Sequence, residues 1–181
     1  MTNHFTDKKI LVVGGSSGIG EATARAFAEA GAHVTIASRN LSKLQSAASR
    51  IGHHTETAIL DTADDSAVQR FFREAGGFDH VVVSAAQTPT GPVRELPLDD
   101  AHQAMNSKFW GAYRVARHVQ INEGGSLTFV SGFLSVRPST PVLQGAINAA
   151  LEALGRGLAL ELASSKVRVN TVSPGLIATP L

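Results

Sequence analysis

Short runs of apolar residues alternate along the chain with longer segments in which apolar positions recur at helical spacing. The runs are rich in valine and isoleucine and nearly continuous, which is typical of strands buried on both faces of a parallel sheet. Six runs are predicted strands: Ile10–Val13, Val34–Ala37, Thr57–Leu60, Asp79–Ser84, Ser126–Ser131 and Val167–Val172. Because a helical segment follows each strand but the last, the pattern predicts a three-layer α/β/α fold with a doubly wound parallel sheet of about six strands.

Five helical segments fill the intervals between these strands. They are expected at Ile19–Ala30, Leu41–Arg50, Asp65–Ala75, Asp99–Val119 and Pro141–Ala163. Side chains that accept hydrogen bonds from free backbone N–H groups mark helix starts, so Asp64 and Asp99 are predicted N-caps. Thr140 is a third predicted N-cap, ahead of Pro141 at the first helical position. No repeat or linker divides the chain, and we expect a single domain over residues 1–181.

The composition limits the kinds of molecule that we expect the protein to bind. The net charge is +1 and only 17% of residues are charged, so the chain lacks the excess of positive charge that is typical of proteins that bind nucleic acid or an anionic membrane. The absence of cysteine excludes disulfides and thiol catalysis, and the seven histidines show no metal-binding spacing, so we predict no metal. No apolar run approaches the ~18 residues of a membrane span, and the N-terminal segment does not resemble a signal peptide. These features favour a cytoplasmic protein with a small-molecule substrate.

A glycine-rich loop, GGSSGIG, lies between the first predicted strand and the first predicted helix. A dinucleotide pyrophosphate needs backbone N–H donors at a helix N-terminus, with no side chains in the way. The loop residues expected to hold it are Gly14, Ser16, Ser17, Gly18, Ile19 and Gly20. No lysine followed by serine or threonine closes the loop, so it is not a nucleotide P-loop. Taken alone, the motif also fits a purely structural turn or the ligand loop of a methyltransferase.

The spacing Gly-x-x-x-Gly-x-Gly resembles that of the short-chain dehydrogenase/reductase family, and the resemblance continues along the whole chain. Asp61 matches the family's adenine contact, Asn106 its helix asparagine and Ser131 its active-site serine. The stretch Asn170–Thr179 matches the loop on the nicotinamide side, with Thr179 expected at the carboxamide. These ordered matches argue against the methyltransferase interpretation. They imply a Rossmann-type domain that binds a nicotinamide cofactor.

Cofactor choice is expected at the end of the second strand. An acidic residue there would bind the ribose 2′-hydroxyl of NAD, whereas this chain has Ser38 followed by Arg39. A guanidinium can bind a phosphate in a fork while a serine hydroxyl donates beside it, which predicts NADP(H). The alternative is that Arg39 is a solvated surface side chain. The resemblance implies further cofactor contacts at Thr62, Ser84, Ala85, Ala86, Asn148, Pro174, Gly175 and Ile177.

Two catalytic positions depart from the family. The resemblance implies a proton-donating tyrosine thirteen residues after the serine and a lysine four residues later, which lowers the pKa of the tyrosine and binds the ribose. This chain has Gln144 and Asn148 there, and its one tyrosine, Tyr113, is expected to be a packing residue. Gln144 and Ser131 could both donate to a substrate carbonyl oxygen, with water as proton source, while Asn148 binds the ribose. Alternatively, Gln144 and Asn148 are merely polar residues facing a cleft.

Three functions are compatible with these features. The first is an NADP(H)-dependent oxidoreductase that transfers hydride to or from a carbonyl, an alcohol or an activated alkene. The second is a catalytically inactive NADP(H)-binding sensor, and the third is a scaffold that has kept only the fold. The intact glycine loop and Asp61 argue against the scaffold. Because Ser131 and Asn106 are retained, the sequence favours the enzyme.

The two long predicted helices indicate an assembly. On the second of them, small residues recur every four positions beside an adjacent leucine face; they are Gly145, Ala149 and Ala153, with Leu151, Leu154 and Leu158. In the family the corresponding helices form a four-helix bundle between subunits, so we expect a homodimer. We also expect the sequence, which ends at Leu181, to lack the substrate-covering segment that follows this point in family members.

Overall fold

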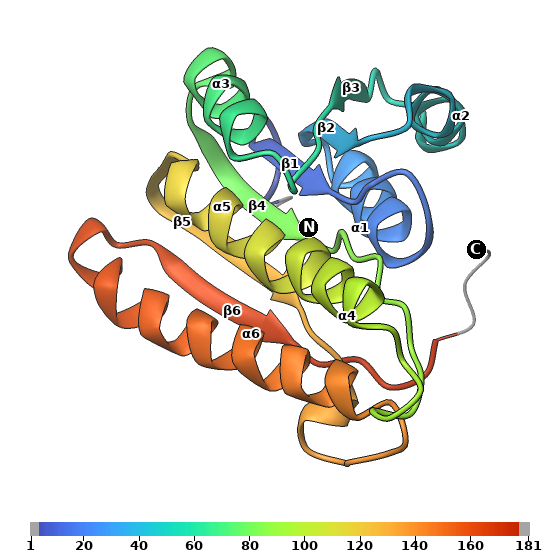
Figure 1. Ribbon diagram of the computed structural model, residues 1–181. Coiled ribbons are helices and arrows are strands. Elements are labelled where there is room, and N and C mark those ends of the chain that lie inside the picture. Colours follow the sequence, from blue (N-terminus) through green and yellow to red (C-terminus); the bar gives the residue numbers. More distant parts are fainter. Residues whose placement is uncertain (1–3, 178–181) are drawn as a thin grey trace.

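The computed structural model describes residues 4–177, which form a three-layer α/β/α fold (Figure 1). Its strands are β1 (Lys9–Val13), β2 (His33–Ser38), β3 (Glu56–Ile59), β4 (Phe78–Val83), β5 (Ile121–Val130) and β6 (Arg168–Val172). Its longer helices are α1 (Gly18–Glu29), α2 (Leu41–Ile51), α3 (Asp65–Ala75), α4 (Leu98–Met105), α5 (Gly111–His118) and α6 (Val142–Glu161). The predicted fold class is confirmed.

All strand pairs are parallel, and the strand order is β3-β2-β1-β4-β5-β6. The chain builds outward from β1 to β3, returns to β4 on the other side of β1, and then builds outward to β6. The direction therefore reverses between β1 and β4. In open parallel sheets, ligands bind outside the carboxyl ends of the strands at such a reversal.

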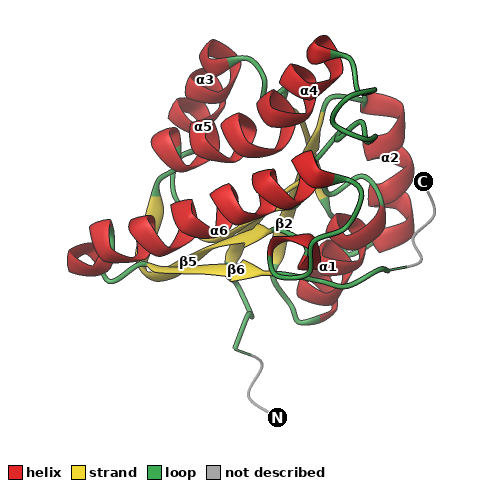
Figure 2. Cartoon of the chain, turned by 60° about the horizontal axis from the view of Figure 1, so that its bottom comes forward, coloured by secondary structure: helices red, strands yellow, loops and turns green. Residues whose placement is uncertain are grey.

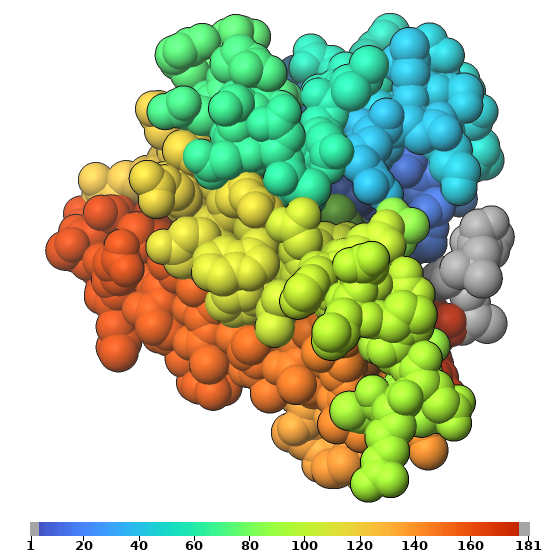
Figure 3. All heavy atoms as spheres, in the orientation of Figure 1, coloured from blue at the N-terminus to red at the C-terminus, as the bar shows by residue number. Residues whose placement is uncertain are grey.

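Alternate side chains of the central strands supply two separate cores, because successive strand residues point to opposite faces of a sheet. On β1, Leu11 and Val13 belong to the core under α3, α5 and α6, whereas Ile10 and Val12 belong to the core under α1 and α2. Figure 2 shows α3 to α6 together on one side of the sheet. In the space-filling view, side chains of these helices form a continuous surface over that face (Figure 3).

Two predicted helix starts are wrong. Asp99 lies inside the first turn of α4 rather than at its N-cap, because that helix already begins at Leu98. The helix α6 begins at Val142, and Thr140 does not cap it with its side chain. Instead, the backbone carbonyl of Thr140 accepts the N–H of Val142 at 2.9 Å, which leaves Pro141 outside the helix as its N-cap.

The long helix predicted over residues 99–119 is interrupted by a π-helical turn, η1 (Asn106–Trp110), which joins α4 to α5. The N–H of Gly111 bonds to the carbonyl of Asn106, five residues earlier. Such turns contain one residue more than an α-helical turn and occur frequently at functional sites. None of the helices within residues 4–177 is long and apolar enough to cross a membrane.

Candidate functional site

The glycine loop packs tightly against its neighbours. Gly14 has a φ of 88°, and a Cβ at this position would lie 2.5 Å from the backbone nitrogen of Ala85, after β4. A Cβ at Gly20 would come within 2.1 Å of the Gly14 carbonyl oxygen. No other residue type fits at either position without moving the backbone. Ser17 is the N-cap of α1 but makes no side-chain capping bond, so the loop presents N–H groups that a phosphate can take.

A cavity of about 880 Å³ opens beside this loop, at the carboxyl ends of β1, β2 and β4. We call it the large cavity, and its size is within the ~300–1,000 Å³ of typical ligand sites. The predicted site residues that line it are Gly14, Ser16, Ser17, Gly18, Ile19, Gly20, Ser38, Arg39, Asp61, Thr62, Ser84, Ala85, Ala86 and Asn106. Its wall also includes Asn40, Lys43 and Gln87, which the sequence analysis did not identify. The fold thus brings together most of the predicted cofactor contacts.

At the end of β2, Ser38 carries a buried hydroxyl oxygen with no hydrogen-bond partner, a feature found at no other side chain in the described part of the chain. An unsatisfied buried polar group costs about 1–3 kcal/mol, which a hydrogen-bonding ligand would remove. Arg39 lies beside it and donates from Nη2 to Oε1 of Gln87 at 2.7 Å. Lys43 adds a second cationic side chain to the same cavity. This end of the large cavity is therefore suited to an anionic group.

A second cavity, of about 190 Å³, lies at the carboxyl ends of β5 and β6; we call it the small cavity. Its lining combines the predicted catalytic residues Ser131, Gln144 and Asn148 with Pro174 and Gly175 from the predicted nicotinamide-side loop. The remaining lining residues are Thr88, Lys108, Gly132, Phe133, Leu134, Ile147 and Leu176. Asn106, which was also predicted as a catalytic residue, borders the large cavity instead.

The hydroxyl of Ser131 donates to Oε1 of Glu152, on α6, at 2.8 Å. Ser135 donates to the same oxygen at 2.6 Å, and Ser173 does so as well. Burial on its own would raise the pKa of Glu152, but the three serine hydrogen bonds and the charge of Arg156 together hold it below its usual value. The carboxylate is therefore ionised at neutral pH. It holds the Ser131 hydroxyl hydrogen within the protein.

The other two predicted catalytic side chains also have partners. Gln144 donates from Nε2 to the Thr88 hydroxyl at 3.1 Å, and Oδ1 of Asn148 accepts from Nζ of Lys108 at 2.7 Å. Gly132 leaves room for this asparagine, because a Cβ there would lie 2.8 Å from its Nδ2. Lys108 was missed from the sequence, because its partner Asn148 is 40 positions away along the chain.

Lys108 also donates from Nζ to the backbone oxygen of Ser131 at 2.7 Å. Burial lowers the pKa of the Lys108 ammonium to about 8, although the charge of Glu152 acts in the opposite direction. Its side chain is the single charged group among the residues that line the small cavity. Tyr113 lines neither cavity; its ring packs edge-to-face on that of Trp110.

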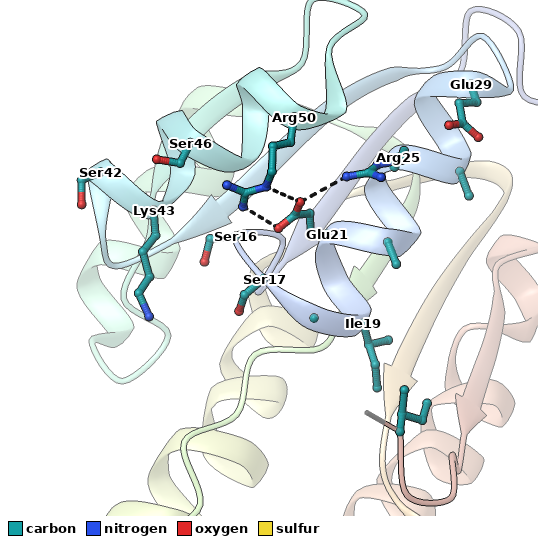
Figure 4. Close-up of a pocket in the computed structure, with 14 residues that line it drawn as sticks. Ser16, Ser17, Ile19, Glu21, Arg25, Glu29, Ser42, Lys43, Ser46 and Arg50 are labelled. Carbon is teal, nitrogen blue, oxygen red and sulfur yellow. Dashed lines mark hydrogen bonds and ion pairs between the residues drawn. The ribbon is translucent and has the colours of Figure 1, made fainter. Parts of the chain in front are cut away.

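One predicted cofactor contact lies elsewhere. Ile177 borders an open groove beside α1 and α2, shown in Figure 4, and not the large or the small cavity. In that groove Glu21 accepts two bonds from Arg50, both at 2.8 Å, and one from Arg25 at 3.4 Å. These arginines are engaged by the carboxylate, and Lys43 is a cationic side chain that lines both this groove and the large cavity. Thr179, the predicted carboxamide contact, lies outside the described residues.

A doubly wound sheet with a glycine loop at its switch point is the architecture of a dinucleotide-binding α/β protein. A family model described as Enoyl-(Acyl carrier protein) reductase matches residues 13–181. The chain belongs to the short-chain dehydrogenase/reductase family and is an oxidoreductase of that type.

Named relatives agree with this assignment. A glucose 1-dehydrogenase of Gluconobacter oxydans (strain 621H) is 33% identical over 193 residues, covering 99% of this chain and 73% of that protein. An uncharacterized oxidoreductase of Staphylococcus aureus (strain USA300) is 30% identical over 189 residues, covering 98% of this chain and 81% of that protein.

Solved structures agree as well. The L-sorbose reductase of Gluconobacter frateurii, complexed with NADPH and L-sorbose, superimposes with a TM-score of 0.91 at 26% identity, covering 99% of this chain and 73% of that one. The protein BdcA in complex with NADPH gives 0.90 at 29% identity, covering 97% and 73%.

Proposed function

We propose that this chain binds NADP(H) in the large cavity and catalyses hydride transfer to or from a carbonyl, an alcohol or an activated alkene. The observation that carries the cofactor assignment is the unpartnered hydroxyl of Ser38, with Arg39 and Lys43 beside it. A 2′-phosphate would satisfy that hydroxyl and neutralise these cations. The NADPH named in the complexes of L-sorbose reductase and BdcA also supports this assignment.

The residues around the large cavity suggest how the cofactor would be held. The glycine loop would bind the pyrophosphate through its backbone N–H groups, and Asp61 would lie on the adenine side. The carboxylate of Asp61 already accepts the N–H of Ala63 at 2.9 Å, which fixes its orientation. Bound NADP(H) would supply or accept the hydride. Gln144 and Asn148, in the small cavity, would bind the substrate oxygen and the ribose, respectively.

A specific observation also favours a second candidate, a cofactor-binding sensor without turnover. The hydroxyl of Ser131 and the amide of Gln144 both donate within the protein, and no tyrosine stands at either position. General acid catalysis typically contributes 10²–10⁴-fold, so its loss would slow a reductase severely. The two candidates differ in whether the bound cofactor is oxidised when a carbonyl compound is added.

Calorimetry with NADPH and NADH tests the cofactor assignment. We expect micromolar affinity for NADPH and weaker affinity for NADH. The substitution Ser38→Asp places a carboxylate against the 2′-phosphate, so it should weaken NADPH binding at least about tenfold, or ~1.4 kcal/mol, and reverse the preference. Ser49→Asp adds the same charge at an exposed position of α2 and should change neither affinity.

Three other results would count against the proposal. An unchanged NADPH/NADH ratio in Ser38→Asp would contradict the assignment of the 2′-phosphate site. Failure of the unaltered protein to bind either nucleotide would favour the scaffold. NADPH binding without any loss of its absorbance on addition of carbonyl compounds would favour the sensor.

A further inference from the structure

The small cavity contains an ammonium group with one hydrogen-bond donor to spare. Nζ of Lys108 donates to the backbone oxygen of Ser131 and to Oδ1 of Asn148, both at 2.7 Å. A lysine ammonium has three N–H donors, and these two partners account for two of them. Both acceptors are neutral carbonyl oxygens, and no ion pair of Lys108 is found within residues 4–177. The third donor is thus available to whatever enters the cavity.

Holding a cation here works against stability. Desolvating an ammonium costs free energy that neutral acceptors restore only in part, and an uncharged side chain of similar length would fill the same space. Two other lysines avoid this cost: Lys8 and Lys166 lie at the surface, each within 4 Å of a carboxylate. Lys108 is also carried by the π-turn η1, where the helix departs from regular geometry. A costly charge on an irregular helical turn indicates a functional role.

We propose that Lys108 is the proton donor of the reaction: its third N–H binds the substrate oxygen and transfers the proton to it during hydride transfer. This inference depends on the proposed function, with NADPH as reductant. The carbonyl π bond breaks, a C–H bond forms with the hydride and an O–H bond forms with the Lys108 proton. The products are the alcohol, NADP⁺ and the neutral amine, which regains a proton from water.

The position of Lys108 relative to α6 supports this role. Asn148 occupies the place where the family resemblance implies a lysine, and Lys108 reaches that side chain from another helix. An ammonium group therefore lies 2.7 Å from the side chain at this place and comes from a different part of the chain. Gln144, fixed by Thr88, lines the same cavity and can orient the substrate oxygen toward the ammonium.

The electrostatic surroundings suit proton transfer near neutral pH. Burial lowers the pKa of Lys108 to about 8, and Glu152, on α6, is the charged group that counteracts this shift. Arg156, also on α6, acts on Glu152. The other residues of the cavity wall carry no charge. A general acid is most effective when its pKa lies near the working pH, because both protonation states are then accessible.

Kinetics of variants test the proposal with aldehydes and 1,2-diketones as probe substrates. Lys108→Met should lower kcat/KM for NADPH-dependent reduction by roughly 10²–10⁴-fold, while NADPH affinity measured by fluorescence stays within a few-fold. Lys166→Met removes an exposed lysine and should leave both quantities unchanged. Asn148→Lys in the Lys108→Met background returns an ammonium to the cavity from α6. This double variant should recover a measurable part of kcat/KM, which a purely structural role of Lys108 would not allow.

The pH profile gives a further readout. In the unaltered protein kcat/KM for reduction should fall as the pH rises through about 8, since the donor must be protonated. This limb should be absent from the residual activity of Lys108→Met.

Reductive methylation tests the lysine without turnover. Formaldehyde with a borane reductant modifies only neutral amines, and mass spectrometry resolves each lysine. The rate at Lys108 should reach half its maximum near pH 8 and be suppressed by NADPH, with the exposed amine of Lys166 as the internal reference. A Lys108 that is unreactive, or that follows the same pH dependence as Lys166, would overturn the proposal.

The outcomes separate this proposal from the proposed function. If the unaltered protein reduces a probe and Lys108→Met reduces it equally well, the role of Lys108 is wrong and the proposed function stands. If the unaltered protein binds NADPH but reduces none of the probes, the proposed reaction itself is wrong, and the proton transfer is wrong with it.

Discussion

The two cavities differ in how their polar side chains are satisfied. In the large cavity, the buried hydroxyl of Ser38 has no partner within the described residues. In the small cavity, Ser131 donates to Glu152 and Gln144 donates to Thr88, so each already has a partner within the protein. A ligand of the large cavity therefore gains a hydrogen bond from a side chain that lacks one. A ligand of the small cavity depends mainly on the spare donor of the lysine.

The lowered pKa of Lys108 predicts a pH-dependent contribution to stability. The folded chain binds this proton less tightly than the unfolded chain, in which the lysine has a pKa near 10.4. Between about pH 8 and pH 10.5 the unfolded state binds more protons at this group, so the free energy of unfolding should rise with pH. The variant Lys108→Met lacks this contribution to the free energy of unfolding, which urea unfolding measures. The unaltered protein should therefore gain roughly 1–3 kcal/mol relative to the variant across that range.

The control for this prediction is Lys166→Met, which removes an exposed lysine and should follow the pH course of the unaltered protein. Parallel stability curves for the unaltered protein and Lys108→Met would show that Lys108 keeps an ordinary pKa when the chain is folded.

Residue-level features were predictable from the sequence where they depend on near neighbours. The cap of α3 is confirmed, since the carboxylate of Asp64 accepts the N–H of Ala67 three residues later at 3.1 Å. Lys108 could not be placed in this way, because its partner Asn148 is 40 positions away and only the fold brings them together. The bond between Ser131 and Glu152 has the same origin.

At the scale of elements, periodicity predicted helices well but missed local irregularities. The π-turn after α4 adds a single residue to a helical repeat, which the spacing of apolar positions does not resolve. The strand β5 was expected from Ser126 but begins at Ile121. The glycines at 124 and 125 interrupt its apolar pattern, and its pairing with β4 shifts register in the same region.

Substitutions at two glycines of α6 should change the free energy of unfolding in opposite directions. A Cβ at Gly155 would lie 2.4 Å from the Thr171 hydroxyl on β6, whereas a Cβ at Gly157 meets nothing within 4 Å. Gly155→Val should therefore lower the free energy of unfolding by about 1–3 kcal/mol through overpacking. Gly157→Ala should raise it by about 0.5–1 kcal/mol through helix propensity. Urea unfolding of both variants measures these effects, and equal changes would contradict the close packing of α6 on β6.

At the scale of the whole molecule, the sheet order places both cavities on one edge of the sheet, on either side of the π-turn. Asn106 and Ser107 border the large cavity, and Lys108 borders the small one. The alternation of strands and helices was sufficient to predict the layers. The division into two cavities was not predictable, because it depends on which side chains of one helical turn face each strand end.

The homodimer expected from the two long helices remains a prediction. Leu151 is buried and Leu154 and Leu158 pack on the core, whereas Ala149 and Ala153 are exposed on the outer face of α6. We propose that this outer face meets its counterpart in a second copy. Light scattering at micromolar concentration should give twice the mass of the chain. The substitution Ala153→Arg should reduce the measured mass to that of a single chain.

The control for the dimer is Gln69→Arg, which adds the same charge at an exposed position of α3 and should leave the mass unchanged. A monomeric mass for the unaltered protein would contradict the proposed assembly.

The sequence of this chain has no lysine at position 148, whereas the folded structure has a lysine ammonium in contact with the side chain at that position. A motif search that demands lysine at position 148 would class it as inactive, while the contact between Lys108 and Asn148 puts an ammonium at that very side chain. Oxidoreductases without the expected motif therefore need to be sorted by the charge found in the folded cavity.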